Sequence, residues 1–173
     1  MMKTPPSASP GRPPAGTRVA VVAARWNAEA TDGLLAGALA RLDAAGLGGS
    51  AIDVVRVPGA FELPLAADRL ATTGRYGAVL CLGAIIRGET SHDRHIAAAV
   101  AHGIEQAGRE RGVPILFGVL TCDTAAQALA RAAVPVAGAT WDEAAFGRNK
   151  GAECAAAALE MMDVLARIPS PAR

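Results

Sequence analysis

Arg18-Val-Ala-Val-Val-Ala-Ala24 is an apolar run of strand length near the start of this 173-residue chain. Apolar residues follow one another in it and do not alternate with polar ones, which predicts a strand buried on both faces. Strands of this kind belong to parallel sheets that helices cover on either side, because the connection between two parallel strands usually contains a helix. The rest of the chain is therefore expected to alternate helices and strands.

The sequence after this run meets that expectation. Leucines and alanines recur at helical spacing over 28–45, and Gly46 follows as a plausible left-handed cap. The segment 134–149 is rich in Pro, Gly and polar residues and is expected to be a long loop. We expect strands at 18–24, 51–57, 78–82 and 114–120, and helices at 28–45, 60–73, 91–111, 123–133 and 150–168. Four βα units without a hairpin signal predict an α/β fold: a three-layer αβα sandwich, flavodoxin-like, with a four-stranded parallel sheet.

Composition excludes several classes of protein. The 17 basic and 16 acidic residues give a net charge of +1, so nothing favours nucleic acid or an anionic membrane surface as a partner. No apolar run reaches the ~18 residues that a membrane span needs. Three widely spaced cysteines indicate a reducing compartment. We expect a cytoplasmic protein with a disordered Pro-rich tail at 1–16 and a single domain at 17–173.

Two features of the composition favour self-association. Aromatic residues make up only 3% of the chain, yet the mean hydropathy is +0.27, and much of this excess is alanine in expected helices. Surplus apolar surface on a small domain usually marks an interface. We therefore expect a homo-oligomer.

Chemically distinctive residues follow each expected strand, where parallel α/β sheets bind their ligands. The third strand leads into Gly83-Ala-Ile-Ile-Arg-Gly-Glu-Thr-Ser-His92, a glycine turn that opens a helix. Backbone N–H groups near Gly88, Glu89 and Thr90 are placed to bind a phosphate, and a φ above zero at Gly88 would let the backbone come close. Thr90 is expected to cap the helix together with Asp93. His92 adds a group that titrates near neutral pH.

Simpler interpretations stand beside these. Trp26 could stack on a planar ligand or plug the sheet edge, Glu62 suits any helix start, and Arg131 could simply be solvated. Lys150 is unfavourable for the dipole of the helix that it begins, which favours a ligand there. The three histidines share a helical face, but no carboxylate set accompanies them, so no metal site is expected. The residues alone indicate a binder of a planar, phosphate-bearing or anionic ligand.

Several blocks together resemble one family. They are Arg25-Trp-Asn27, Val57-Pro-Gly-Ala-Phe-Glu-Leu-Pro64, Gly83 to His92, Pro114-Ile-Leu-Phe-Gly-Val-Leu-Thr121, Gln127-Ala-Leu-Ala-Arg131 and Asn149-Lys-Gly-Ala-Glu153. In this order, over about 18–165, they resemble the lumazine synthase family. The resemblance implies a transferase of riboflavin biosynthesis that condenses 5-amino-6-(D-ribitylamino)uracil with 3,4-dihydroxy-2-butanone 4-phosphate. The product is 6,7-dimethyl-8-ribityllumazine; phosphate and water are released, and no cofactor is needed.

The resemblance also implies residue roles. Trp26 takes the place of the aromatic ring that stacks over the pyrimidine, and Asn27 lines the same turn. The ribityl chain and ring edge would be bound by Ala60, Phe61 and Glu62, and the heterocycle by backbone groups of Ile85 and Ile86. The phosphate would be held by Gly88, Glu89, Thr90 and Arg131. His92 would be the catalytic proton shuttle. The adjacent subunit of a homopentamer would supply Phe117, Arg131 and Lys150.

The chain departs from the family pattern in two places. Asp93-Arg94-His95 stands where the family has aromatic, acidic and aromatic residues, and the segment from Arg131 to Asn149 is longer than usual, which leaves open whether Lys150 reaches the site. That segment bears on assembly in the family, so pentamer, pentamer pair and sixty-subunit shell stay open. Two alternatives remain: a non-catalytic flavin- or lumazine-binding or shell-forming relative, and a related pentameric enzyme that dismutates lumazine.

Overall fold

The computed structural model describes residues 13–137 and 139–169 and contains one parallel sheet. Its strands are β1 (Val19–Ala24), β2 (Ile52–Val57), β3 (Ala78–Ile86) and β4 (Ile115–Cys122), in the order β2-β1-β3-β4. Val19 pairs with Ile52 on one side and with Ala78 on the other. The predicted four-stranded parallel sheet is confirmed.

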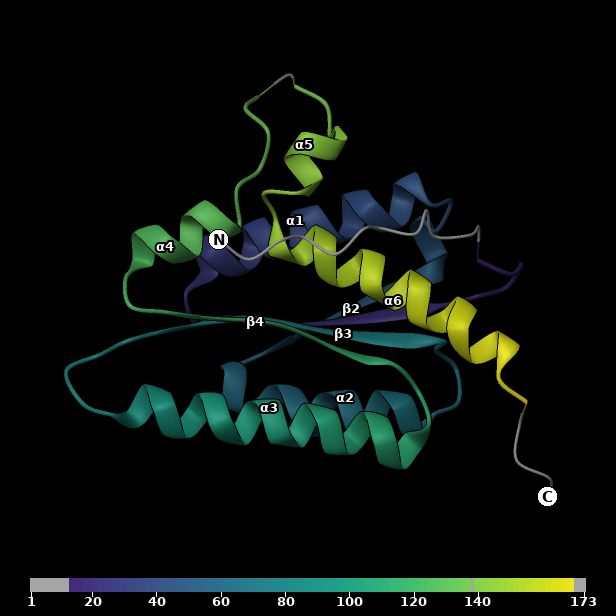
Figure 1. The fold of residues 1–173 in the computed structure, drawn as a ribbon, viewed down its shortest axis with the longest axis horizontal. Coiled ribbons are helices and arrows are strands. Elements are labelled where there is room, and N and C mark those ends of the chain that lie inside the picture. The colour runs from purple at the N-terminus through teal and green to yellow at the C-terminus, as the bar shows by residue number, and fades with distance from the viewer. Residues whose placement is uncertain (1–12, 138, 170–173) are drawn as a thin grey trace.

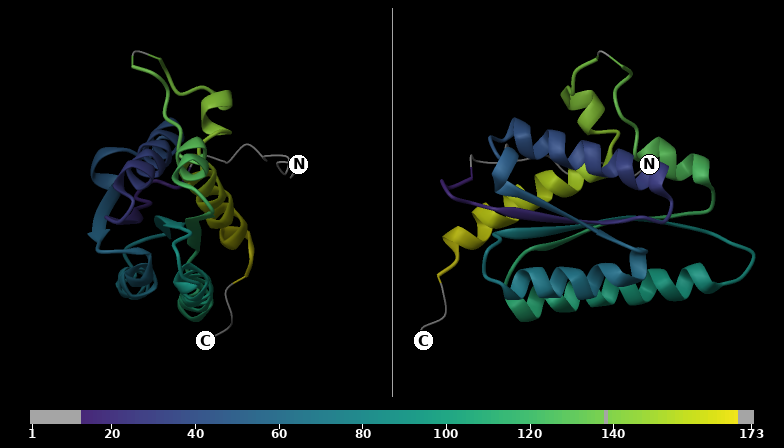
Figure 2. Two further views of the ribbon diagram at one scale, coloured as in Figure 1. Left: turned by 90° about the vertical axis from the view of Figure 1, so that its left-hand side faces the viewer. Right: turned by 180° about the vertical axis from the view of Figure 1, so that it is seen from behind.

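Helices cover both faces of this sheet (Figure 1). One layer contains α2 (Leu63–Thr72), which the short 3₁₀ turn η2 (Ala60–Glu62) precedes, and α3 (His92–Arg111). The other contains α1 (Ala28–Ala44), α4 (Ala125–Arg131) and α6 (Lys150–Arg167). A further 3₁₀ turn, η1 (Gly49–Ala51), leads into β2. The end-on view in Figure 2 separates the two helical layers. This is the predicted αβα sandwich.

The side chains of β1 explain why its sequence does not alternate. Val19 and Val21 point into the core beneath α1 and α6, whereas Ala20 and Val22 point into the core beneath α2 and α3. All four are fully buried. A central strand covered on both faces has no position for a polar residue, so β1 lies in the interior that its sequence predicts.

Two sequence-based boundaries are wrong, the end of β3 and the start of α3. β3 continues through Gly83 to Ile86 and pairs with β4 along this stretch, so the turn begins only at Arg87. Gly83 is a packing glycine, because an added Cβ would lie 3.3 Å from Cδ1 of Leu63. Thr90 is not the cap of α3: the cap position belongs to Ser91, which makes no side-chain capping bond to any described residue.

The expected loop 134–149 contains a short helix, α5 (Glu143–Phe146), which stands out from the α1 side of the molecule (Figure 1). Asp142 caps it by accepting from the Ala145 N–H at 2.7 Å. Trp141 stacks on Phe146 with ring centroids 5.4 Å apart, and the Arg41 guanidinium lies 4.8 Å from the Phe146 centroid. The aromatic stack lies within the segment, and Arg41 fastens the segment to α1 through this cation–π contact and a 2.8 Å ion pair with Glu143.

Residues 1–12 of the expected tail lie outside the described part of the chain, and residues 13–16 form neither helix nor strand. No described helix is long and apolar enough to cross a lipid bilayer.

Candidate functional site

A cavity of about 490 Å³ opens at the carboxyl ends of β1 and β3. Most of the site residues that the sequence analysis proposes line this cavity. They are Trp26, Asn27, Ala60, Phe61, Glu62, Ile85, Ile86, Gly88, Thr90 and His92; Gly59, Ala84, Asp93 and Ile96 line it as well. Glu89 lies in the same turn but is not part of this lining.

The turn after β1 presents an aromatic ring and fixes an amide. The Trp26 N–H donates to the Pro58 carbonyl at 3.1 Å, while the indole remains 73% exposed. Asn27 has φ 56°, the left-handed region that asparagine tolerates better than most residues. Its Nδ2 donates to the Ala84 carbonyl at 2.7 Å, which joins the end of β1 to β3. One side of the cavity is thus a cross-linked turn with an exposed ring.

The turn after β2 orients a carboxylate. Oε2 of Glu62 accepts from the Gly59 N–H at 2.8 Å, as in a capping box. An added Cβ at Gly59 would lie 3.2 Å from that oxygen and 3.5 Å from Cδ1 of Trp26, so the glycine leaves room for both. Phe61 is 62% exposed beside them. Glu62 therefore caps the 3₁₀ turn η2 and also lines the cavity.

The turn between β3 and α3 holds three of the proposed phosphate residues, Gly88, Glu89 and Thr90, next to His92. The Arg87 N–H donates to the Cys122 carbonyl at 2.9 Å, and the Arg87 guanidinium lies 3.6 Å from the Asp123 carboxylate, so this turn is attached to the end of β4. Gly88 does not have the expected positive φ, and an added Cβ there would meet nothing within 4 Å. His92 is the exposed first residue of α3, where partial positive charge accumulates.

The unusual triplet after His92 affects the cavity at one position. Asp93 lines it, whereas Arg94 and His95 are exposed and lie outside the lining. Ile96 adds an apolar wall that the sequence analysis missed. Its spacing from His92 was the available signal, because residues four apart share a helical face.

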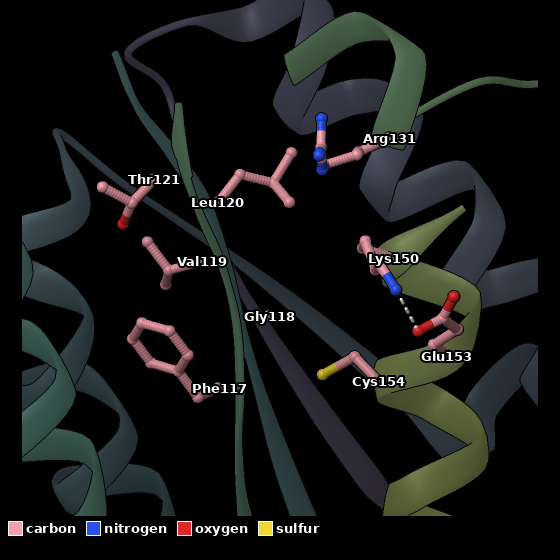
Figure 3. A pocket seen from close by; sticks show the side chains of 9 residues that line it. All are labelled: Phe117, Gly118, Val119, Leu120, Thr121, Arg131, Lys150, Glu153 and Cys154. Atoms are coloured by element: carbon pink, nitrogen blue, oxygen red, sulfur yellow. Dashed lines mark hydrogen bonds and ion pairs between the residues drawn. The ribbon is translucent and has the colours of Figure 1, made fainter. Parts of the chain in front are cut away.

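A second cavity, of about 370 Å³, lies along β4 between α4 and α6 (Figure 3). It contains the remaining proposed residues, Phe117, Arg131 and Lys150, which come from β4, the end of α4 and the start of α6. The longer segment before Lys150 therefore does not separate it from Arg131. Arg131 and Lys150 lie on the same side of β4, whereas the ring of Phe117 points to the opposite side of this strand (Figure 3).

Each cation here already has an oxygen partner. Nζ of Lys150 lies 2.6 Å from Oε2 of Glu153, and Nη1 of Arg131 donates to the Gln127 carbonyl at 3.1 Å. Glu153 also lines the cavity and was missed as a site residue, although its spacing of three from Lys150 predicts the pair. An anion entering this space would meet two cations and one carboxylate.

The structure thus divides the proposed site into two groups, and no described residue lines both cavities. One group has the exposed rings, Glu62 and His92, and the other has the two cations. The imidazole of His92 lies in one group, and the side-chain cations Arg131 and Lys150 lie in the other. Within the described residues, no group of three His, Cys, Asp or Glu side chains is arranged to hold a metal ion.

Comparison with known proteins identifies the family of this chain. Residues 16–166 match the model of the 6,7-dimethyl-8-ribityllumazine synthase family. A 6,7-dimethyl-8-ribityllumazine synthase of Xanthomonas oryzae pv. oryzae (strain PXO99A) is 45% identical over 158 residues, which cover 91% of this chain and 95% of that protein. The enzyme of the same name from Xylella fastidiosa (strain 9a5c) is 43% identical over 156 residues, 90% of this chain and 94% of its own length. The family model covers most of the chain and these relatives match it nearly end to end, so the chain belongs to the 6,7-dimethyl-8-ribityllumazine synthase family.

Proposed function

We propose that this enzyme of riboflavin biosynthesis joins its two substrates, 5-amino-6-(D-ribitylamino)uracil and 3,4-dihydroxy-2-butanone 4-phosphate, in a site that two copies of the chain complete together. The observation that carries the proposal is that the proposed site residues of one chain line two separate cavities. Trp26, Glu62 and His92 line one, and Arg131 and Lys150 line the other. In a cyclic assembly, every subunit presents one surface to its left-hand neighbour and a different one to its right-hand neighbour. The cavity that Arg131 and Lys150 line in one copy then faces the cavity that His92 lines in the next copy.

The first cavity is suited to the pyrimidine. Trp26 offers an exposed face on which a planar ring can stack. The Glu62 carboxylate, held by Gly59, accepts hydrogen bonds from the ribityl hydroxyls. Backbone groups at the end of β3, from Ile85 and Ile86, complete the edge of the heterocycle. Binding in this orientation directs the reactive amine of the pyrimidine toward the turn before α3.

The turn before α3 and the second cavity are suited to the phosphorylated ketone. Backbone N–H groups around Gly88 and Thr90 bind phosphate oxygens at the start of a long helix, where the dipole favours an anion. Arg131 and Lys150 of the neighbouring copy neutralise the remaining charge. Negative charge develops on the phosphate as it leaves, and these groups contact it. They therefore stabilise the elimination as well as the binding.

His92 moves the protons. Imine formation needs a proton removed from the amine and another delivered to the departing water, and phosphate elimination needs a carbon-bound proton removed. One imidazole can serve these steps in turn, because its ring nitrogens can accept a proton and donate one. Holding both substrates against it converts an encounter in solution into a reaction within one complex, which raises the effective concentration of each.

Exposed apolar side chains support self-association. Trp26, Phe61, Leu65 and Phe117 are between 46% and 73% exposed in a single chain, and the first two line one cavity while Phe117 lines the other. Apolar surface of this kind is usually covered by a partner. We propose a homo-oligomer, a pentamer in its simplest form, with one complete site at each contact.

The deciding experiment mixes purified protein with both substrates and follows lumazine absorbance together with released phosphate. The proposal predicts equal amounts of both products above the uncatalysed rate. No lumazine above that rate, combined with tight binding of preformed lumazine or flavin, would instead establish the non-catalytic alternative. Light scattering on the same sample gives the number of copies.

A further inference from the structure

We infer that Asn149 is a positioning residue for the proposed phosphate site, because its buried side chain fixes Arg131 and Lys150 relative to each other. The inference rests on the proposed function, in which these two cations bind the phosphate. It concerns a residue that lines neither cavity. Its basis is the number and the direction of the hydrogen bonds that this one amide makes.

Asn149 has no exposed surface, and its amide group is fully bonded. Nδ2 donates to the Gly33 carbonyl at 2.9 Å and to the Ala133 carbonyl at 3.0 Å. Oδ1 accepts from the Gly151 N–H at 2.9 Å and from the Ala152 N–H at 3.1 Å. An asparagine side chain has two donor hydrogens and two acceptor sites, and all four are used here. Such a saturated buried amide has one orientation.

These bonds join three parts of the chain next to the two cations. Gly33 belongs to α1, and Ala133 lies two residues after Arg131, the last residue of α4. The N–H groups that Oδ1 accepts from belong to the two residues after Lys150, in the first turn of α6. A backbone bridge between Ala132 and Asn149 runs beside the side-chain bonds. The ends of the long segment 132–149 are therefore fastened together at their base.

Glycines in α1 leave room for the Asn149 side chain and for the segment that it binds. An added Cβ at Gly37 would lie 2.2 Å from Oδ1 of Asn149, and one at Gly33 would lie 2.3 Å from the Ala132 carbonyl oxygen. On the facing helix, a Cβ at Gly151 would lie 1.9 Å from the Leu34 carbonyl oxygen. Distances this short require displacement of the neighbouring atoms. Close approach of α1, α6 and the segment after α4 thus depends on three glycines around one asparagine.

The four hydrogen bonds of the Asn149 amide explain how Lys150 and Arg131 share a cavity although a protruding segment separates them in the sequence. The distance between the cations is set at the base of the segment, by Asn149, and not by the length of what protrudes. A purely stabilising asparagine would lower the stability of the fold when replaced, but it would not single out the substrate that the cations hold. This difference can be measured.

The test is Asn149→Ser in the full-length assembled enzyme. Serine keeps an oxygen that can cap α6, but it lacks the donors that hold Ala133 and Gly33. We expect the KM for the butanone phosphate to rise about tenfold or more, because small misplacements of binding groups weaken binding steeply. The KM for the pyrimidine and kcat should change less than about twofold. Calorimetric titration with inorganic phosphate should show the same loss of affinity.

Leu159→Ala is the control, because Leu159 is a buried residue of the same helix whose truncation removes packing and touches no polar contact. It should lower the melting temperature without separating the two KM values. An equal rise of both KM values in Asn149→Ser, or the same pattern in Leu159→Ala, overturns the inference.

Gly37→Ala provides a second route if Asn149→Ser does not fold, since it pushes on the same amide from α1 and should give the same selective rise. Failure of both variants to assemble, while Leu159→Ala assembles, would assign Asn149 to folding alone. If the wild-type enzyme makes no lumazine, the proposed function fails, and the phosphate titration still tests Asn149 by itself.

Discussion

The Nδ2 atom of Asn27 donates to the Ala84 carbonyl at 2.7 Å. This bond joins the turn after β1 to strand β3, and both residues line the cavity that contains His92. The backbone of Asn27 is left-handed at the same time, with φ 56°. A single residue thus satisfies a hydrogen bond between strands and accepts a conformation that most residues resist.

Replacements of Asn27 separate these two contributions. Asn27→Gly loses the bond but keeps the left-handed backbone without steric strain, so the free energy of unfolding should fall by about 1 kcal/mol. Asn27→Ala loses the bond and must also hold a left-handed backbone, which costs about 1–2 kcal/mol more. Urea unfolding at matched protein concentration measures both. Equal losses in the two variants would contradict a role for the backbone conformation.

Replacement of His92 tests the proton shuttle. His92→Ala should lower kcat by about 10²–10⁴-fold, the usual contribution of a general acid–base, and should leave the melting temperature unchanged because the side chain is exposed. His95→Ala is the matched control on the same helix, since His95 is exposed and does not line the cavity. Comparable rate losses in the two variants would remove His92 from the mechanism.

The fold could be predicted because its central strands β1 and β3 are continuous apolar runs that alternate with helical patterns along the chain. Two local errors have one physical origin: glycine and polar residues were interpreted as turns. Gly83 lies inside β3, where it makes room for Leu63, and segment 134–149 holds a helix whose aromatic contacts become visible only when Arg41 of α1 lies beside Phe146. Tertiary packing overrides local preference at both places.

The resemblance to the family named most residues that line the two cavities, and it also set Phe117, Arg131 and Lys150 apart from the rest. Composition and spacing alone do not predict this grouping, because it depends on where the strands and helices lie in space. Glu153 and Ile96 were missed although helical spacing connects them with Lys150 and His92. Spacing indicates which residues share a face, whereas the sheet order decides which faces meet.

Mixing two inactive variants tests whether the site is shared. His92→Ala damages one cavity and Arg131→Ala the other, so each variant alone should be nearly inactive with the phosphorylated substrate. If neighbours complete each other's sites, refolding the two together should restore about a quarter of wild-type activity, because random cyclic assembly leaves about a quarter of the contacts with both residues intact. His92→Ala mixed with a His92→Ala, Arg131→Ala double variant is the control and should stay inactive. No recovery in the first mixture would locate both residues in sites within single chains.

A cluster at the opposite end of the sheet predicts a pH dependence of stability. The Tyr76 hydroxyl donates to Oδ2 of Asp53 at 2.6 Å, and Arg18 donates to the same oxygen at 2.7 Å. The hydrogen bond from Tyr76, followed by the one from Arg18, lowers the pKa of Asp53 below its ordinary value. A carboxyl group whose pKa is lower in the folded state stabilises the fold above its unfolded pKa of about 3.9 and loses that contribution as the pH falls through the folded pKa.

Tyr76→Phe removes the hydroxyl that contributes most to this shift. The variant should unfold at lower urea concentration than the wild type at pH 7, and the gap should shrink below about pH 3.9, because a protonated Asp53 no longer gains from the donor. Arg75→Ala is the control: its guanidinium lies 3.8 Å from the same carboxylate but is 60% exposed, so solvent screens the pair and the unfolding midpoint should hardly move. A gap between Tyr76→Phe and wild type that stays constant from pH 7 to pH 3 would mean that Tyr76 stabilises the fold by packing and not through the charge of Asp53.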